Sequence, residues 1–323
     1  MGVYRPRSFL ETAWRGVAAI YTGETPPAAE KIRRYAASLG VPVHYLTNKD
    51  VERAFRCYDA VIFVEALGGV VRLICPHLRD KEADPPVLVV DREGRYFVPL
   101  VGAHRGANKL AEELAAALGG VAVITTAVEA AGATPPEELE KMLLCRMTRE
   151  ERLRVAAALR DGKEICVADV EAAPPGYKSG RNCGLTIRRD HSCGEGEICC
   201  RPLRLYVGLG LTSAAAPEEA AEAVRKVLED LGADLSAVAA LASVKPAALE
   251  VAKRLGVPAV VYRLEELKVD WDCLSPPSPK ALEALGIPGA AEPAALTAAG
   301  PGASLIYRKR VLGRVTVAVA AAP

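Results

Sequence analysis

His104 and Asn108 are the two side chains whose types and spacing best suit acid–base chemistry. They lie four residues apart within residues 102–108, so they share one face if a helix begins there. An imidazole with a pKa near neutral pH can take a proton from water, and backbone N–H groups at a helix start favour a developing oxyanion. We therefore predict that both residues are catalytic. The alternative is that the histidine only begins a helix and that Asn108 is an ordinary polar residue of its first turn.

Five residues upstream have the chemistry to hold a substrate that carries carboxylates. Gly68, Gly69 and Arg72 follow one apolar segment, whereas Lys81 and Asp84 precede the next. Glycine lets a ligand approach the backbone closely, an arginine fork matches a carboxylate, and lysine supplies a point charge. We predict that all five bind substrate. The alternatives are a tight turn at the glycine pair and a solvated loop around the lysine.

A second glycine pair, Gly208 and Gly210, ends a predicted strand in the last third of the chain, and we predict that it also faces substrate. No third glycine follows at the spacing of the dinucleotide-binding fingerprint. The chain also has no phosphate-binding Gly-Lys-Ser/Thr loop. The sequence therefore argues against a nicotinamide or flavin site and against a nucleoside triphosphate site of that kind.

The cysteines fit three kinds of chemistry. Four of the nine cysteines, together with His191, fall within residues 183–200. That number could supply a zinc or iron–sulfur site, but no Cys-x-x-Cys pair is present and adjacent cysteines seldom bind one metal. The cysteines could instead form disulfides, which intracellular proteins of hyperthermophiles do use, or stay as free thiols. We predict no metal site here. The four cysteines are Cys183, Cys193, Cys199 and Cys200.

Alternating strands and helices must position the candidate residues at 68–72, 81–84 and 102–108. Apolar segments of strand length alternate at short intervals with segments of helical periodicity, which is typical of a parallel, doubly wound sheet. Ligands of such sheets bind beyond the carboxyl ends of the strands, so we expect Arg72, Lys81 and His104 to meet in one pocket there. The expected strands span residues 16–22, 41–46, 60–64, 87–91 and 121–126, and the expected helices span 26–39, 50–58 and 109–118.

We predict a fold of two doubly wound α/β domains joined by a small cysteine-containing middle module. The boundaries we expect are 1–134, 135–202 and 203–323. In the middle module, a helix capped by Thr148 and a strand at 163–170 precede an irregular linker over 173–202. The last domain is expected to have strands at 203–210, 237–243, 259–262, 304–307 and 314–320, and helices at 217–231, 245–255, 278–285 and 291–299.

Composition places the chain among globular proteins. Half of the 323 residues are apolar, a quarter are charged, and the net charge is +1. A field this weak gives no support for nucleic-acid binding. The apolar runs are shorter than the roughly 20 residues of a membrane span, and the first residues lack the apolar core of a secretory signal. We therefore expect a cytoplasmic protein with no membrane partner.

The chain resembles the cobalt-precorrin 5A hydrolase family (CbiG-type) of anaerobic cobalamin biosynthesis. The resemblance covers about residues 15–130 and 203–322, in the family's order. In the first part it includes Gly-Gly-Val-Val-Arg at 68–72 and the runs at 80–87, 102–108 and 123–127. In the last part it includes residues 205–210, Lys245, 275–279, 286–289, 291–296 and 315–318.

The resemblance implies a hydrolase. Water would open the δ-lactone of a cobalt-containing tetrapyrrole, and acetaldehyde would then leave. Because the substrate carries the cobalt, the implied enzyme needs no cofactor of its own. Its partner would be the tetrapyrrole, which is rich in carboxylates, so Lys245 is implied as a further substrate-binding residue. A homodimer is the assembly left open.

Three positions depart from the family's pattern. Arg105 replaces one of two glycines after His104, residues 210–214 lack the usual arginines, and no acid follows Lys245. These departures would suit a rival interpretation, a tetrapyrrole-binding homologue that has lost hydrolysis. A third interpretation makes the cysteine segment a redox or metal module. If the histidine is not the base, Asp84 and Glu292 are the next candidates.

Overall fold

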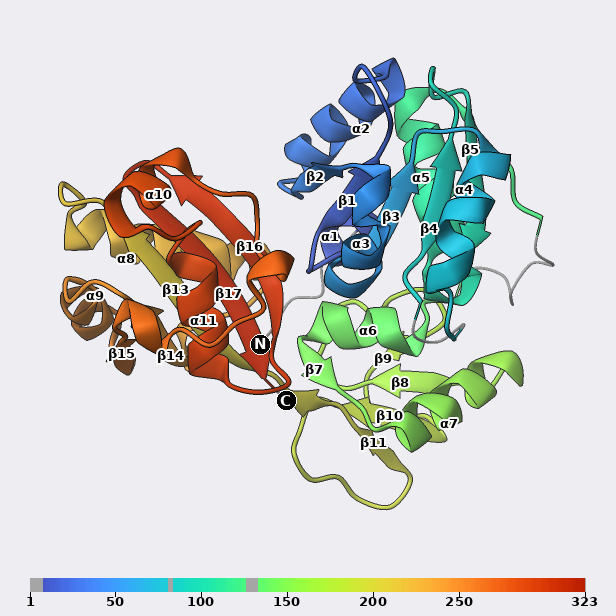
Figure 1. Cartoon of the computed structure of the whole chain (residues 1–323). Helices are drawn as coiled ribbons and strands as arrows, with labels where there is room; N and C mark the ends of the chain where they lie inside the picture. Colours follow the sequence, from blue (N-terminus) through green and yellow to red (C-terminus); the bar gives the residue numbers. More distant parts are fainter. Residues whose placement is uncertain (1–7, 81–83, 126–132, 323) are drawn as a thin grey trace. The chain divides into compact units, whose positions relative to one another are not determined.

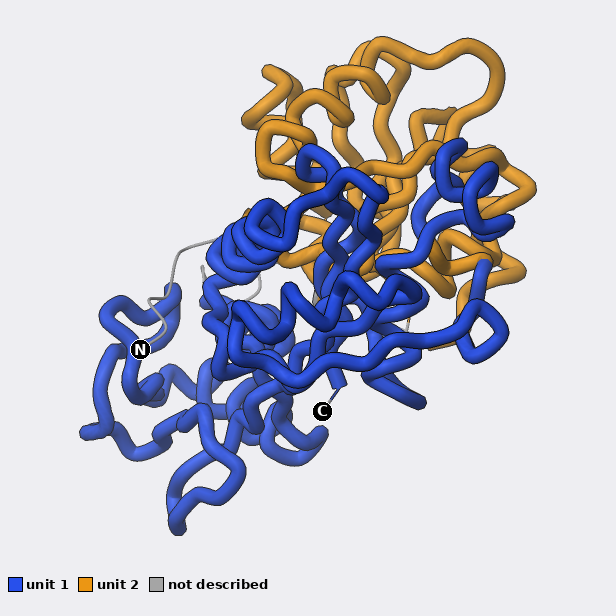
Figure 2. The backbone as a smooth tube through the Cα atoms, turned by 90° about the vertical axis from the view of Figure 1, so that its left-hand side faces the viewer, with its two compact units in different colours: residues 1–6, 129–271, 275–323 blue, residues 7–128, 272–274 orange. Residues whose placement is uncertain are grey.

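The chain divides into two compact units (Figure 2). The computed structural model describes residues 8–80, 84–125 and 133–322, without the side chain of His104. The N-terminal unit comprises residues 7–128 together with 272–274, and the second unit comprises residues 1–6, 129–271 and 275–323. The boundaries expected after residues 134 and 202 stay a prediction. Among the described residues, no helix is both long enough and apolar enough to span a membrane.

A six-stranded sheet forms the centre of the N-terminal unit. Its strand order is β2-β1-β3-β4-β5-β6, and the first four of these strands are mutually parallel. Strands β1, β3 and β4 are buried along their whole length, as near-continuous apolar strands covered on both faces must be. The strands span Val17–Ile20, Val43–Leu46, Ala60–Phe63, Val87–Val90, Tyr96–Val101 and Val121–Ala122 in chain order.

Helices cover both faces of this sheet (Figure 1). Residues of α3 (Val51–Cys57) and α4 (Leu67–Ile74) share one core cluster with the strands. Residues of α1 (Phe9–Thr12), α2 (Pro27–Ser38) and α5 (Ala107–Leu118) share the other. The two clusters place a helical layer on each side, which confirms the predicted doubly wound α/β fold.

Strand β5 reverses the direction of the chain and is absent from the strands expected from the sequence. It pairs antiparallel with β4, with Val101 opposite Val87 and Phe97 opposite Val90. The segment that follows β5 therefore begins beside the amino end of β4. The expectation that the candidate residues meet beyond the carboxyl ends of parallel strands is therefore wrong for residues 102–108, and also for Asp84, which precedes β4.

The C-terminal sheet has the order β15-β14-β13-β17-β16. Its first three strands in the chain are parallel, and β17 runs antiparallel to both of its neighbours. The strands span Arg204–Leu211, Val238–Ser243, Ala259–Val261, Ser304–Leu312 and Val315–Ala322 in chain order. The helices are α8 (Pro217–Leu231), α9 (Ala248–Leu255), α10 (Pro279–Leu285) and α11 (Ala291–Ala299), and α8 and α11 have the predicted bounds.

The middle region is more regular than the predicted linker. Strands β8 (Ile165–Val167), β9 (Lys178–Ser179), β10 (Leu185–Arg188) and β11 (Glu197–Cys199) form a parallel sheet in the order β11-β10-β8-β9. Helices α6 (Pro136–Leu143) and α7 (Arg149–Arg160) precede it, and β7 (Cys145–Arg146) pairs with β12 (Arg201–Pro202). Thr148 caps α7 as predicted. Four short strands, β9 to β12, thus lie in the stretch expected to be irregular.

Disulfides account for the cysteines of this region. The bonded pairs are Cys145–Cys200, Cys166–Cys183 and Cys193–Cys199. The disulfide hypothesis is therefore confirmed over free thiols. Among the described residues, no group of three or more His, Cys, Asp or Glu side chains is placed to hold a metal ion.

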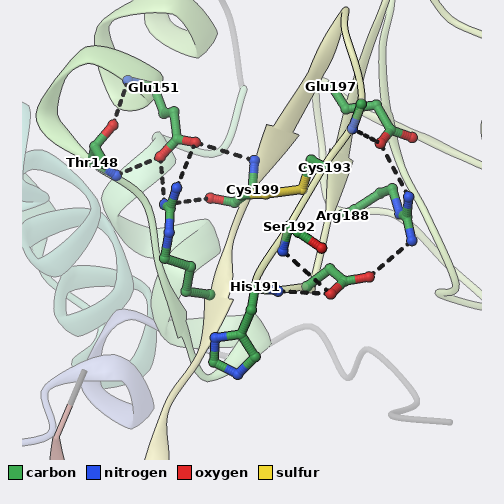
Figure 3. Close-up of a disulfide and its surroundings, with 11 residues drawn as sticks. Thr148, Glu151, Arg188, His191, Ser192, Cys193, Glu197 and Cys199 are labelled. Carbon is green, nitrogen blue, oxygen red and sulfur yellow. Dashed lines mark hydrogen bonds and ion pairs between the residues drawn. A yellow bond between two sulfur atoms is a disulfide. The ribbon is translucent and has the colours of Figure 1, made fainter.

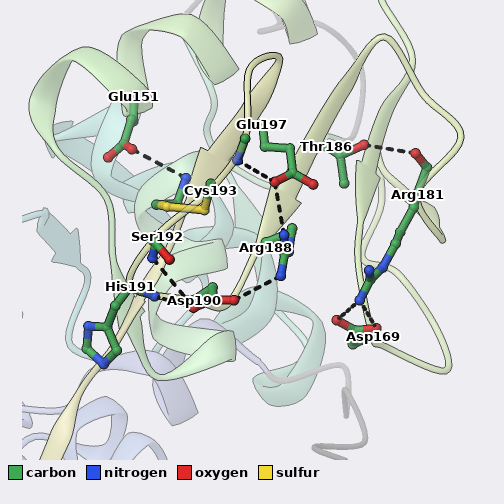
Figure 4. Close-up of polar contacts among 12 residues, drawn as sticks. Glu151, Asp169, Arg181, Thr186, Arg188, Asp190, His191, Ser192, Cys193 and Glu197 are labelled. Atoms are coloured by element: carbon green, nitrogen blue, oxygen red, sulfur yellow. Dashed lines mark hydrogen bonds and ion pairs between the residues drawn. A yellow bond between two sulfur atoms is a disulfide. The ribbon is translucent and has the colours of Figure 1, made fainter.

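An arginine clamp closes the short connection between β10 and β11. Parallel neighbours usually need a dozen or more connecting residues, but only residues 189–196 connect these two strands. Arg188 donates to Glu197 Oε2 at 3.1 Å and to Asp190 Oδ2 at 2.9 Å, as Figure 4 shows. The Cys193–Cys199 disulfide lies beside it (Figure 3). Charge and a covalent bond together hold a loop that has no helix of its own.

Glu151 fastens α7 to the end of the same sheet (Figure 3). Its carboxylate accepts hydrogen bonds from Arg201, from the Cys199 N–H at 3.3 Å and from the Thr148 N–H at 2.7 Å. Burial raises the pKa of Glu151, but the bonds from Arg201 and Thr148 outweigh burial and lower the pKa to about 2. The folded state therefore favours the ionised carboxylate.

The segment 272–274 is fastened to α3 although it lies far away in the sequence. A disulfide joins Cys57 to Cys273 across a separation of 216 residues. Arg53 Nε donates to the carbonyl of Asp272 at 2.6 Å, and Arg56 pairs with the Asp272 carboxylate at 3.2 Å. This segment therefore belongs to the N-terminal unit by covalent bond, hydrogen bond and ion pair together.

We expect Glu151→Gln to lower stability at neutral pH and to flatten its dependence on acid. A carboxyl group whose folded pKa is depressed stabilises the fold above its ordinary pKa of 4.5, and this contribution is lost as the pH falls towards about 2. Thermal melting followed by circular dichroism from pH 7 to pH 2 measures the effect. Exposed Glu150→Gln is the matched control. Equal acid sensitivity of Glu151→Gln and wild type would contradict this role.

The double variant Cys57→Ser/Cys273→Ser should melt well below the wild type. A cross-link that closes a loop of this length restricts the unfolded chain by about 5 kcal/mol in the chain-entropy model. Differential scanning calorimetry under non-reducing conditions measures the shift. Cys75→Ser, which removes an exposed free thiol, should leave the melting temperature unchanged. A double variant as stable as wild type would show that the bond does not stabilise the fold.

Candidate active site

The order of the strands marks one edge of the N-terminal sheet as the place for a ligand. From β1 the chain moves to β2 on one side and then to β3 on the other. The carboxyl ends of β1 and β3 therefore form a topological switch point, where ligands of open α/β sheets bind. Thr22 follows β1, and Glu65 follows β3 just before α4. We take this edge as the candidate active site.

Thr22 and Glu65 bind each other across the switch point. The Thr22 N–H donates to Glu65 Oε1 at 2.5 Å, and the Thr22 hydroxyl donates to the same oxygen at 2.6 Å. Glu65 is half-buried and Thr22 is exposed. The pair holds a carboxylate at the surface in one orientation. Neither residue was predicted from the sequence, although each is a polar residue that follows a buried apolar strand.

Gly68 and Gly69 lie in the first turn of α4 with no packing reason to be glycine. Both are exposed, and neither adopts a positive φ angle. A Cβ atom on Gly69 would have no neighbour within 4 Å, and one on Gly68 would meet only the end of the Arg72 side chain at 3.8 Å. Glycine inside a helix costs about 0.5–1 kcal/mol relative to alanine. The benefit that offsets this cost is bare backbone that a ligand can approach.

Arg72 reaches back towards the same edge. Its NH1 group donates to the carbonyl of Gly68 at 3.0 Å, so the guanidinium lies along the first turn of α4. The helix also exposes Leu67 and Val71, with 44% and 43% of their surfaces accessible. A cation, two apolar side chains and bare backbone thus line one surface. Such a surface can contact an apolar ring and one of its carboxylates.

Residues 102–108 lie at the opposite edge of the sheet. Val101 pairs with Val87 at the amino end of β4, and His104 and Asn108 come directly afterwards in a 3-10 turn and the start of α5. A Cβ atom on Gly102 would lie 2.7 Å from the Pro86 Cα, so that glycine serves packing. The prediction that His104 shares a pocket with Arg72 is wrong, because β5 runs antiparallel.

Of the predicted clamp residues, Asp84 also lies at the amino edge, just ahead of β4. Lys81 falls outside the described residues. The Asp84 carboxylate accepts the N–H groups of Arg79 at 2.9 Å and Asp80 at 3.2 Å, and its backbone carbonyl accepts from Arg105. Asp84 therefore closes its own loop just ahead of β4. The substrate-binding role of Lys81 stays a prediction.

The two glycines predicted in the C-terminal sheet, Gly208 and Gly210, both lie in β13 but have different surroundings. A Cβ atom on Gly208 would lie 1.9 Å from the carbonyl oxygen of Ala291, so this glycine lets α11 pack against β13. Gly210 lies nearer the carboxyl end of β13. The Ser243 hydroxyl donates to the Leu209 carbonyl at 2.8 Å and accepts the Lys245 N–H at 3.1 Å. These bonds hold the backbone of Lys245 close to that of Gly210 at one edge.

Glu292 is a buried anchor rather than a free base. Its carboxylate accepts the Ser275 N–H at 2.8 Å, the Ser275 hydroxyl at 2.6 Å and the Lys309 N–H at 3.0 Å. Burial lowers the pKa of the Lys309 amine, against the opposing charge of Glu292. That amine donates to the Pro276 carbonyl at 2.6 Å. The network fixes the proline-rich loop that begins at Ser275.

Comparison with known proteins gives one consistent family. A model described as cobalamin synthesis G N-terminal matches residues 49–129, and one described as cobalamin synthesis G C-terminus matches residues 205–320. A cobalt-precorrin-5A hydrolase from Priestia megaterium is 28% identical over 302 residues, which cover 83% of this chain and 80% of that protein.

Two further relatives agree with this result. A cobalt-precorrin-5A hydrolase from Salmonella typhimurium is 39% identical over 97 residues, 30% of this chain and 28% of that protein. The crystal structure of a cobalamin biosynthesis protein G homologue from Sulfolobus solfataricus matches with a TM-score of 0.79 and 29% identity. That match covers 97% of this chain and 99% of the other.

Alanine at Gly69 and at Gly208 should have opposite effects on stability. Gly69→Ala adds a methyl group to open space in a helix, so the melting temperature should stay or rise, while a ligand that needs the bare backbone should bind more weakly. Gly208→Ala should destabilise the fold because its methyl group meets the Ala291 carbonyl. Thermal melting and ligand titration measure both effects. Unchanged affinity in Gly69→Ala would remove Gly69 from the site.

Proposed function

The chain belongs to the cobalamin synthesis G family, and we propose that it is a cobalt-precorrin-5A hydrolase. It opens the δ-lactone of cobalt-precorrin-5A with water and yields cobalt-precorrin-5B and acetaldehyde, a step of anaerobic cobalamin biosynthesis. The observation that carries this conclusion is the match of both halves of one family, in order, to the N-terminal and C-terminal sheets. The Priestia megaterium relative supports it over most of the chain.

The chemistry has two requirements. Water must attack the lactone carbonyl, which needs a base and a place for the developing oxyanion. The ring C–O bond then breaks, leaving a carboxylate and an alcohol. When the alcohol loses its proton, the adjacent C–C bond breaks, acetaldehyde leaves, and the macrocycle keeps the electron pair. The many carboxylates of the tetrapyrrole also have to be bound by cations and N–H groups.

We assign substrate binding to two surfaces. Gly68, Gly69 and Arg72 present bare backbone and a guanidinium at the carboxyl edge of the N-terminal sheet. Gly210 and Lys245 lie at the carboxyl edge of the C-terminal sheet, where Ser243 at the end of β14 fixes the Lys245 backbone. Each surface suits a carboxylate. Asp84 and Gly208 are better explained as loop and packing residues, so their predicted contact with substrate has little support.

A catalytic role of His104 and Asn108 is a competing hypothesis to a catalytic site at the switch point. They lie at the amino edge of the sheet, away from the switch point and from Gly68. The family resemblance of residues 102–108 is what supports them. A variant at His104 therefore has to be tested beside variants at the switch point.

The remaining expectations follow from the substrate. We propose that the enzyme needs no resident metal or cofactor, since the cobalt arrives with the tetrapyrrole. We also propose a cytoplasmic location, where the disulfides would be of the kind found in hyperthermophiles. Nucleic acid has no proposed role, and a homodimer is the assembly to test by light scattering.

Incubation with cobalt-precorrin-5A should release acetaldehyde in proportion to the macrocycle consumed. Arg72→Ala and Lys245→Ala should each raise KM about tenfold with little change in kcat, because a charge-assisted bond to a carboxylate acts in the ground and transition states alike. Lys253→Ala, an exposed lysine on α9, is the matched control. Coupled alcohol dehydrogenase measures the acetaldehyde.

Two outcomes would change this assignment. Substrate binding without any acetaldehyde would favour the tetrapyrrole-binding homologue that lacks hydrolase activity. Normal KM values in both variants, with full turnover, would remove Arg72 and Lys245 from substrate binding while leaving the hydrolase function intact.

A further inference from the structure

We propose that Glu65 is the general base that activates water for lactone opening, with Thr22 as its positioning residue. This role rests on the proposed hydrolase function. The proposed base lies at the switch point between β1 and β3, where no catalytic residue was expected from the sequence. The proposal stands on the position of the carboxylate, on its hydrogen bonds and on the bare backbone beside it.

The two oxygens of the Glu65 carboxylate differ in their surroundings. Oε1 accepts both hydrogen bonds from Thr22, at 2.5 Å from the N–H and 2.6 Å from the hydroxyl. No hydrogen bond to Oε2 is found within the described part of the chain. One oxygen is thus anchored to the neighbouring strand end while the other is available for a water molecule. A general base requires this combination of fixed orientation and an open lone pair.

Three carboxylates that could compete for this role have both oxygens occupied. In Asp84, Oδ1 and Oδ2 both accept the N–H of Arg79. In Glu292, Oε1 binds the Ser275 hydroxyl and Oε2 binds the Ser275 N–H. In Asp91, at the end of β4, Oδ1 and Oδ2 both bind Arg95. These carboxylates hold loops together, whereas Glu65 keeps one oxygen clear of such bonds within the described residues.

The neighbours of Glu65 leave room for a reacting group. Gly68 and Gly69 follow within four residues, and their missing side chains leave open space above the backbone. Arg72 lies along the same turn and can hold a substrate carboxylate. A lactone carbonyl placed over the glycines would lie beside the turn that carries Glu65, which precedes Gly68 by three residues. The same surface that binds the macrocycle therefore also offers the base.

The proton balance of the step is complete without another reactant. Glu65 takes a proton from water while the water oxygen bonds to the lactone carbonyl carbon. When the tetrahedral intermediate collapses, the bond from that carbon to the ring oxygen breaks, and the leaving oxygen takes the proton back from Glu65. The carboxylate is regenerated, and the lactone has become a carboxylic acid and an alcohol.

Glu65→Gln should lower kcat by about 10²–10⁴, the usual contribution of a positioned acid–base group, with little change in KM. Thr22→Val keeps the carboxylate but removes the hydroxyl anchor, so a smaller loss is expected. Glu24→Gln, an exposed carboxylate in the same loop as Thr22, should behave as wild type. Added formate should partly restore Glu65→Ala.

The outcomes separate the two proposals. A wild-type protein that releases no acetaldehyde overturns the hydrolase function and the role of Glu65 with it. An active wild type with a fully active and folded Glu65→Gln overturns only the role of Glu65. If His104→Ala then abolishes kcat at normal melting temperature, the base lies at the amino edge of the sheet instead. Loss of kcat in Glu65→Gln with formate rescue of Glu65→Ala supports the proposal.

Discussion

The antiparallel pairing of β5 with β4 decides which residues of the N-terminal unit can act together. Because Val101 lies opposite Val87, the chain leaves β5 at the amino edge of the sheet. His104 and Asn108 are therefore separated from Gly68 by the length of the strands, although all of them lie within about forty residues of sequence. With β5 reversed, the carboxyl edge is left to the ends of β1 to β4. The location of the candidate site depends on this one pairing.

Most helices and parallel strands could be predicted from the sequence, whereas β5 could not. The bounds of α8 and α11 match because apolar periodicity and flanking turn residues agree there. Pro99 argues against a strand, since proline cannot donate to a sheet. The structure tolerates it because β6 pairs only with Tyr96 and Phe97, which leaves Pro99 without a strand neighbour on that side among the described residues. The length of the neighbouring strand β6 is a property of the tertiary structure, so no local sequence pattern could predict it.

The glycines show that sequence alone also could not identify the residues of the candidate site. In the sequence Gly69, Gly102 and Gly208 are all glycines beside apolar segments, and each suits a ligand equally well. In the structure a Cβ atom would meet Pro86 at Gly102 and Ala291 at Gly208, but nothing at Gly69. Packing thus explains two of the three glycines, and only the unexplained one remains informative about function. The cysteines show the same limit of sequence-based prediction, because their spacing alone did not distinguish disulfides from free thiols or metal ligands.

Glu65 illustrates how a functional residue can be ordinary in sequence and distinctive in structure. A glutamate after a strand is common, and Thr22 lies more than forty residues away. Only the adjacency of β1 and β3 brings the threonine to one carboxylate oxygen and leaves the other oxygen open. The same adjacency defines the switch point, so the parallel pairing of β1 with β3 also orients the proposed base. Fold and chemistry are therefore linked through two strand ends, and the family resemblance at residues 68–72 lies immediately beside them.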